Sequence, residues 1–96
     1  MVIKDYYKIL GFENNKVNIE QIKNAYRDQA KKYHPDVNKN NRQAEERFKD
    51  IGEAYNTLSN DKKRRKYDRL WYYYIGRKNK QNQKYREAKV KDFMNL

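Results

Sequence analysis

Few residues of this chain have side chains suited to catalysis or to a specific binding contact. Three candidates are consecutive: His34, Pro35 and Asp36. His34 is the only histidine and Pro35 the only proline among the 96 residues, and there is no cysteine. Nucleophilic hydrolysis needs a nucleophile, a base and an oriented stabiliser. Ser59 and Thr57, each the sole residue of its type, are the only hydroxyl candidates besides tyrosine. We therefore expect no enzymatic activity of the chain's own.

A metal site is suggested by Asp36-x-Asn38-x-Asn40, which copies the start of an EF-hand calcium loop. The rest of that loop is missing, because Asn41 stands where glycine is needed and Arg47 where a bidentate glutamate is needed. The asparagines are better explained as turn-forming residues. We expect no metal, no cofactor and no small-molecule substrate.

The elements around His34 are predicted to be helices, since three glycines and one proline give little support for tight β-hairpins. Two stretches, 19–33 and 44–58, carry apolar residues at helical spacing. These residues are Ile19, Ile22, Ala25, Tyr26, Ala30 and Tyr33 in the first stretch, and Ala44, Phe48, Ile51, Tyr55 and Leu58 in the second. Pro35 must end the first helix. The two helices should pack as an antiparallel hairpin with residues 34–41 as its exposed tip.

Two shorter helices are expected at either side of this hairpin, giving an all-α fold. One spans residues 5–10, with Asp5 as its N-cap and Gly11 as its stop. The other spans about 61–70, follows the capping residues Ser59 and Asn60, and should turn Tyr67 and Leu70 toward the core. We expect residues 1–70 to form the domain and residues 71–96 a basic, aromatic extension that continues the helix or begins a linker.

The net charge of +11, from 24 basic and 13 acidic residues, predicts an acidic or polyanionic partner. No apolar run is long enough to span a bilayer, and the N-terminus lacks the apolar region of a secretory signal. We therefore expect a cytoplasmic protein without a membrane partner.

Several ordered motifs resemble the J-domain of the DnaJ/Hsp40 co-chaperones. They cover residues 5–68 and run from Asp5-Tyr6-Tyr7-Lys8-Ile9-Leu10-Gly11 through Ile22-Lys23-Asn24-Ala25-Tyr26-Arg27, Lys31-Lys32-Tyr33-His34-Pro35-Asp36 and Phe48-Lys49-Asp50-Ile51-Gly52-Glu53-Ala54-Tyr55 to Tyr67-Asp68. The resemblance implies the J-domain fold and a role in protein folding, through binding an Hsp70 (DnaK-type) chaperone and stimulating its ATP hydrolysis.

The same resemblance implies residue roles. Asp36 of the His34-Pro35-Asp36 motif would engage an arginine of the Hsp70, and a basic stripe on the second helix would dock on an acidic Hsp70 surface. The stripe consists of Lys23, Arg27 and Lys31, and Tyr26, Phe48 and Lys49 occupy positions that the family uses near the contact. Lys63 and Arg64 match a basic motif with a supporting role. Asp28 stands where the family commonly has a basic residue. It either weakens the positive potential used for docking or pairs with Lys31 or Lys32 along the helix.

A nucleic-acid-binding module is the alternative from a different functional class. It would use basic residues of the extension, with Tyr72 to Tyr74 as stacking surfaces. These basic residues are Arg77, Lys78, Lys80, Lys84 and Arg86. The apolar run 70–75 is open to two interpretations, a partly buried continuation of the helix or an exposed docking strip.

Overall fold

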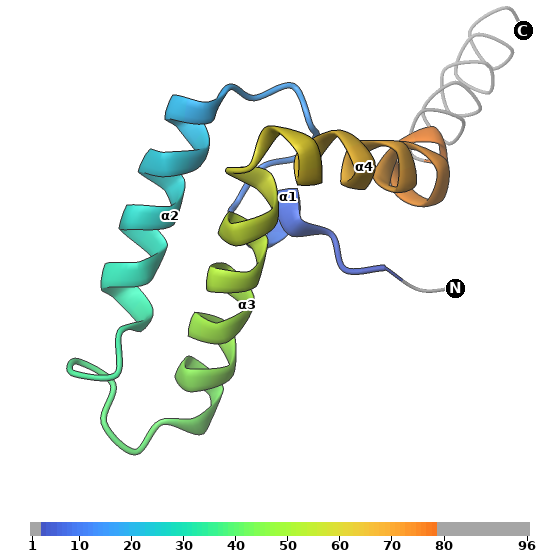
Figure 1. The fold of residues 1–96 in the computed structure, drawn as a ribbon. Helices are drawn as coiled ribbons and strands as arrows, with labels where there is room; N and C mark the ends of the chain where they lie inside the picture. Colours follow the sequence, from blue (N-terminus) through green and yellow to red (C-terminus); the bar gives the residue numbers. More distant parts are fainter. Residues whose placement is uncertain (1–2, 79–96) are drawn as a thin grey trace, which may run out of the picture.

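The computed structural model describes residues 3–78, and these contain helices and no strand. The helices are α1 (Tyr6–Ile9), α2 (Ile19–Tyr33), α3 (Arg42–Leu58) and α4 (Asp61–Trp71), and α4 runs on into a π-helical turn, η1 (Tyr72–Gly76). Figure 1 shows α2 and α3 as the long pair, with α1 and α4 near one end of it. The all-α prediction is confirmed.

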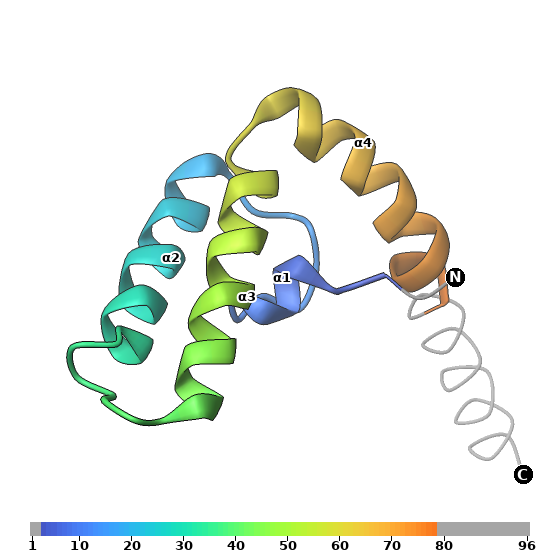
Figure 2. The same cartoon turned by 60° about the horizontal axis from the view of Figure 1, so that its bottom comes forward.

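α2 and α3 form the expected antiparallel hairpin, and both views show them side by side (Figures 1 and 2). α2 begins at a reciprocal capping box, in which the Gln21 backbone N–H donates to Asn18 Oδ1 and the Asn18 backbone N–H donates to Gln21 Oε1, each at 2.9 Å. It ends at Tyr33 because His34 is extended, with ψ at 139°, as a residue before proline prefers. The loop 34–41 therefore lies at the tip.

α1 packs beside α3 (Figures 1 and 2), and its Tyr7 and the following Leu10 are both buried in the core. Asp5 caps the helix as predicted, accepting from the Lys8 backbone N–H at 3.2 Å. Gly11 ends it with a φ of +96°, a conformation that favours glycine. The core cluster that α1 joins consists of Tyr7, Leu10, Ile22, Ile51, Ala54, Leu58, Tyr67 and Trp71.

α4 begins beyond the end of α3 that lies opposite the tip, and it runs away from α2 (Figures 1 and 2). Asn60 caps it by accepting from the Lys63 backbone N–H at 3.0 Å. Tyr67 is buried as predicted, but the prediction for Leu70 is wrong, since Leu70 is 43% exposed and Trp71 fills the core instead at 4%. Trp71 packs edge-on against Tyr7, with ring centroids 5.5 Å apart, and its Nε1–H donates to Asp5 Oδ1 at 2.9 Å. A buried indole needs such an acceptor.

The turn η1 keeps the chain against the core beyond α4. Gly76 lies directly beside the Trp71 ring, where a Cβ would sit 2.5 Å from Cζ3, and Ile75 packs against the core cluster. Leu70, Tyr72 and Tyr73 point to solvent. The run 70–75 is thus partly buried and partly exposed, and the packing extends to Gly76. That its exposed part is a docking strip stays a prediction. The domain boundary expected after residue 70 stays a prediction. Among residues 3–78, no helix is long and apolar enough to cross a membrane.

Candidate functional site

The Asp36 carboxylate is far more exposed to solvent than the imidazole ring of His34 at the tip. Its side chain is 87% exposed, compared with 49% for His34. The backbone of Asp36 is nevertheless fixed, because its N–H donates to His34 Nδ1 at 3.1 Å. The backbone of Asp36 is therefore positioned by the turn, while its carboxylate faces solvent.

His34 links this turn to α3. Its ring packs edge-on against Phe48, with centroids 5.5 Å apart and an interplanar angle of 77°. A ring nitrogen that accepts a hydrogen bond carries no proton, so the bond to Nδ1 requires the neutral imidazole with its proton on Nε2. Nδ1 also lies 3.7 Å from Asp36 Oδ2, a contact that becomes an ion pair only when the ring is protonated.

Asn38 is a structural residue of the tip that sequence reasoning treated only as a turn former. Its side-chain amide donates to the carbonyl oxygens of Lys32 and His34, at 2.8 and 3.0 Å. These carbonyls lie at the end of α2, where no further helical turn can satisfy them. Asn40 adopts a positive φ of 62°, which asparagine tolerates better than most residues. The loop is thus ordered by its own polar side chains.

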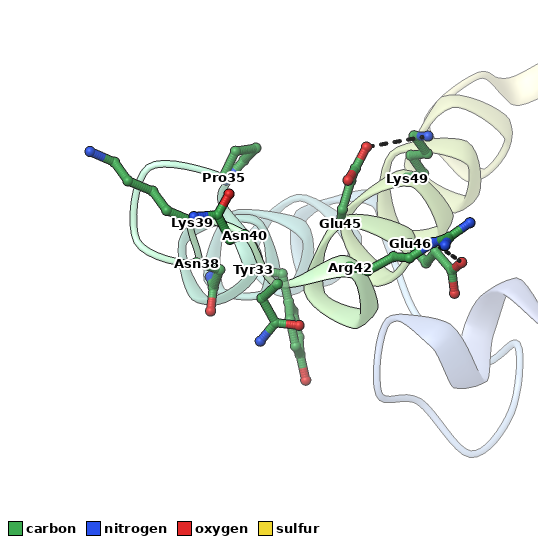
Figure 3. A pocket seen from close by; sticks show the side chains of 10 residues that line it. Tyr33, Pro35, Asn38, Lys39, Asn40, Arg42, Glu45, Glu46 and Lys49 are labelled. Atoms are coloured by element: carbon green, nitrogen blue, oxygen red, sulfur yellow. Dashed lines mark ion pairs between the residues drawn. The ribbon is translucent and has the colours of Figure 1, made fainter.

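An open hollow of about 700 Å³ lies between this loop and the first turns of α3 (Figure 3). Pro35 and Asn38 line it from the loop, and Glu45 and Lys49 from α3. Lys49 pairs with Glu45 across one turn, with Nζ 3.6 Å from Oε1. The positive charge of Lys49 is therefore partly balanced within its own helix.

The basic stripe of α2 leads toward the tip. Arg27 and Lys31 are exposed, and Lys23 is half-buried. Asp28 is exposed beside them, and the ion pairs found within residues 3–78 do not include it. Of the two alternatives for Asp28, pairing with Lys31 or Lys32 is therefore not seen.

Tyr26 contacts α3 and is only partly exposed to solvent. It is half-buried and stacks on Tyr55 of α3, with ring centroids 4.1 Å apart and an interplanar angle of 14°. The contact stabilises the hairpin, so any role of Tyr26 in docking would use only the exposed part of its ring.

Comparison with known proteins agrees with this geometry. The family model described as DnaJ domain matches residues 5–68. The chain belongs to the DnaJ domain family. It is 59% identical over 67 residues to the Chaperone protein DnaJ of Caldicellulosiruptor saccharolyticus, covering 70% of this chain and 17% of the relative. It is 51% identical over 73 residues to that of Chlorobaculum tepidum, covering 76% and 18%. The proteins of that name match this J-domain chain over less than a fifth of their own length.

The basic pair of this J-domain, Lys63 and Arg64, divides into one exposed and one structural residue. Lys63 is exposed. Arg64 turns inward, where its Nε–H donates to Tyr7 Oη at 3.0 Å and its Nη2 donates to the carbonyl oxygens of Val17 and Asn15, at 2.6 and 3.2 Å. Arg64 therefore ties α4 to α1 and to the loop before α2.

Asp68 completes this cluster by accepting a hydrogen bond from the Tyr7 hydroxyl and lying 3.7 Å from Arg64 Nε. Burial and the bond to Asp68 raise the pKa of Tyr7 well above its usual value. The network holds the J-domain together at the end away from Asp36.

DnaJ domains are co-chaperone modules and not enzymes, which agrees with the small inventory of nucleophiles.

The structure describes only some of the residues named for the nucleic-acid-binding alternative. Arg77 and Lys78 are exposed, as are Tyr72 and Tyr73, while Tyr74 is half-buried. The remaining basic residues named for that alternative lie outside the described residues: Lys80, Lys84 and Arg86.

Proposed function

We propose that this J-domain docks on an Hsp70 (DnaK-type) chaperone in the cytoplasm and stimulates its ATP hydrolysis, in support of protein folding. The direct contact is made by the Asp36 carboxylate to an arginine of the Hsp70. The observation that carries the proposal is a carboxylate that is 87% exposed on a loop whose backbone is fixed.

The chemistry of the tip suits a single directed contact. A carboxylate binds a guanidinium through two parallel, charge-assisted hydrogen bonds, and this geometry depends on orientation. Three residues supply the orientation: Pro35 restricts φ, His34 accepts from the Asp36 N–H, and Asn38 binds the last carbonyls of α2. A loop that is ordered before binding loses less conformational entropy on docking.

The stripe of Lys23, Arg27 and Lys31 supplies attraction to an acidic surface of the Hsp70. Such charges mainly raise the association rate and select the partner. Asp28 lies among them and lowers the local positive potential. Phe48 acts through His34, whose ring it supports, and Lys49 adds a charge at the edge of the contact.

The test is single-turnover ATP hydrolysis by an Hsp70 from the same organism, with the wild-type J-domain and the Asp36→Asn variant. Asparagine keeps the size of the side chain but removes the charge, so we expect stimulation to fall to the level of Hsp70 alone. Glu13→Gln, which neutralises an exposed carboxylate in the loop before α2, should stimulate like the wild type. Full stimulation by Asp36→Asn would refute the proposed contact.

The stripe is tested separately by the salt dependence of the stimulation. Arg27→Gln should raise the J-domain concentration needed for half-maximal stimulation and make it less sensitive to salt. Asp28→Asn should have the opposite effect. If both variants shift the half-maximal concentration in the same direction, the stripe does not act through its charge.

A further inference from the structure

The positive charge of the J-domain is gathered on one segment that the proposed docking does not use. Residues 62–78 hold eight basic side chains and one acidic one, whereas residues 3–61 hold eleven basic and ten acidic. The single acid of the segment is Asp68, which faces inward onto Arg64 and Tyr7. The solvent side of α4 keeps a net positive charge, since the carboxylates near it are Asp61, the first residue of the helix, and the half-buried Asp68.

Helical spacing lines these charges up with exposed aromatic rings. Each exposed residue of this side lies three or four positions from another one, which places them on one face. They are Lys62, Arg65, Lys66, Arg69, Tyr72 and Tyr73. Tyr72 and Tyr73 are 54% and 58% exposed, so most of each ring is open to a ligand. We call these six residues the α4 face.

The rings of the α4 face are held in position. Trp71, the residue before them, is buried, bonded to Asp5 and covered by Gly76, so the backbone that carries Tyr72 and Tyr73 cannot turn freely. The Tyr73 ring packs edge-on against Tyr74, with centroids 5.0 Å apart, and the Arg77 guanidinium lies over it at 5.4 Å. The guanidinium of Arg77 therefore lies over one side of the Tyr73 ring, and a base would use the remaining exposed ring surface.

We propose that the α4 face binds single-stranded nucleic acid. Phosphates would follow the lysine and arginine side chains, and bases would stack on Tyr72 and Tyr73, a combination typical of strand binding without sequence preference. This surface lies at the open end of the hairpin, away from Asp36, so the inference is independent of the Hsp70 proposal (Figures 1 and 2).

A membrane surface fits the same charges less well. A helix that lies on a membrane places its basic residues on one side and a continuous apolar side in the lipid. The apolar side of α4 is already packed into the protein through Tyr67 and Trp71. On the α4 face, the charged side chains and the aromatic rings lie on the same side. A single strand of nucleic acid needs this arrangement, because its phosphates bind the cations while its bases stack on the rings.

The charge part of the proposal is tested by fluorescence anisotropy with a labelled RNA of about 20 nucleotides and mixed sequence, at about 50 to 200 mM salt. The full chain with Arg65→Gln, Lys66→Gln and Arg69→Gln should bind at least about tenfold more weakly, with a salt slope smaller by about 2. The matched control removes three exposed charges elsewhere: Lys8→Gln, Lys16→Gln and Lys39→Gln. Its affinity should stay within about twofold of the wild type. Equal losses in both variants would show binding by net charge alone and overturn the proposal.

The stacking part is tested with the pair Tyr72→Leu and Tyr73→Leu, which should weaken RNA binding about tenfold or more without changing the salt slope. Tyr72→Phe with Tyr73→Phe keeps both rings and should bind like the wild type. Tighter binding to a duplex of the same sequence would overturn the stacking arrangement. Binding to vesicles of phosphatidylserine and phosphatidylcholine, with no binding to RNA, would assign the α4 face to membranes instead.

Discussion

The tip of the hairpin and its open end are stabilised by different kinds of contacts. At the tip, the hydrogen bonds of His34 and Asn38 join residues two to six positions apart, and the groups involved are exposed. At the open end, Arg64 bonds to Tyr7 and Trp71 to Asp5, across 57 and 66 positions, with both Tyr7 and Trp71 buried. Substitutions at the open end should therefore cost more global stability than substitutions at the tip, where the contacts are local and exposed.

Arg64→Gln should have the largest effect on stability. Glutamine cannot reach Tyr7, Val17 and Asn15 together, and the half-buried Asp68 loses its cation. We expect a loss of about 2 to 3 kcal/mol in the free energy of unfolding, measured by urea denaturation.

The matched control is the neighbouring change Lys63→Gln. Lys63 is exposed, so its loss should cost less than about 0.5 kcal/mol. Similar costs for the two variants would contradict the division of this basic pair into a structural and an exposed residue.

The close approach of Gly76 to Trp71 gives the next largest effect. A Cβ at residue 76 would meet the Trp71 ring at 2.5 Å, and that ring is held by Asp5 and Tyr7. Gly76→Ala should therefore cost about 1 to 3 kcal/mol in thermal or urea unfolding.

Gly52 provides an opposite case for the same substitution. It lies within α3, and nothing lies within 4 Å of a Cβ built there. Gly52→Ala should stabilise the protein by about 0.5 to 1 kcal/mol, because alanine favours the helix. If Gly76→Ala is equally stabilising, the turn η1 does not pack against Trp71 in solution.

Alkaline pH should destabilise the open end. Burial raises the pKa of Tyr7 and of Tyr67 above about 10, the ordinary value for tyrosine. The folded state holds both protons more tightly, so this stability is fully present below about pH 10 and is lost as the pH rises toward the folded-state pKa values. The loss should steepen above about pH 10 toward a limit of about 1.4 kcal/mol per pH unit for each tyrosine.

Tyr7→Phe should remove the Tyr7 share of that slope, measured by urea unfolding between about pH 10 and 11. Lys4, whose hydrogen bonds to Glu53 and Asp50 raise its pKa to about 12, titrates in the same direction in both proteins. An unchanged slope in Tyr7→Phe would mean that Tyr7 is not buried with its proton.

The same contrast explains which features could be predicted from the sequence. The bounds of α2 and the position of the tip follow from local information: the cap at Asn18, the apolar spacing and Pro35. The choice of Trp71 over Leu70 for the core depends on an acceptor at Asp5, 66 positions away, which helical spacing does not reveal. The inward turn of Arg64 likewise depends on Tyr7 and Val17. Membership of the J-domain family can be recognised because its motifs are runs of consecutive residues. The network between α1 and α4 joins residues that lie far apart in the sequence, so no such run reveals it.

Asp36→Asn should have little effect on stability, and it tests the comparison at the tip itself. The carboxylate is 87% exposed, and the hydrogen bond that fixes the turn uses the backbone N–H of Asp36, which the substitution keeps. We expect a change below about 0.5 kcal/mol in urea unfolding. Asn38→Ala, two residues further on, removes two hydrogen bonds to carbonyl oxygens and should cost about 1 kcal/mol. An equal cost for Asp36→Asn would mean that the carboxylate helps to hold the loop, and a loss of ATPase stimulation in that variant could then reflect a disordered tip instead of a missing charge.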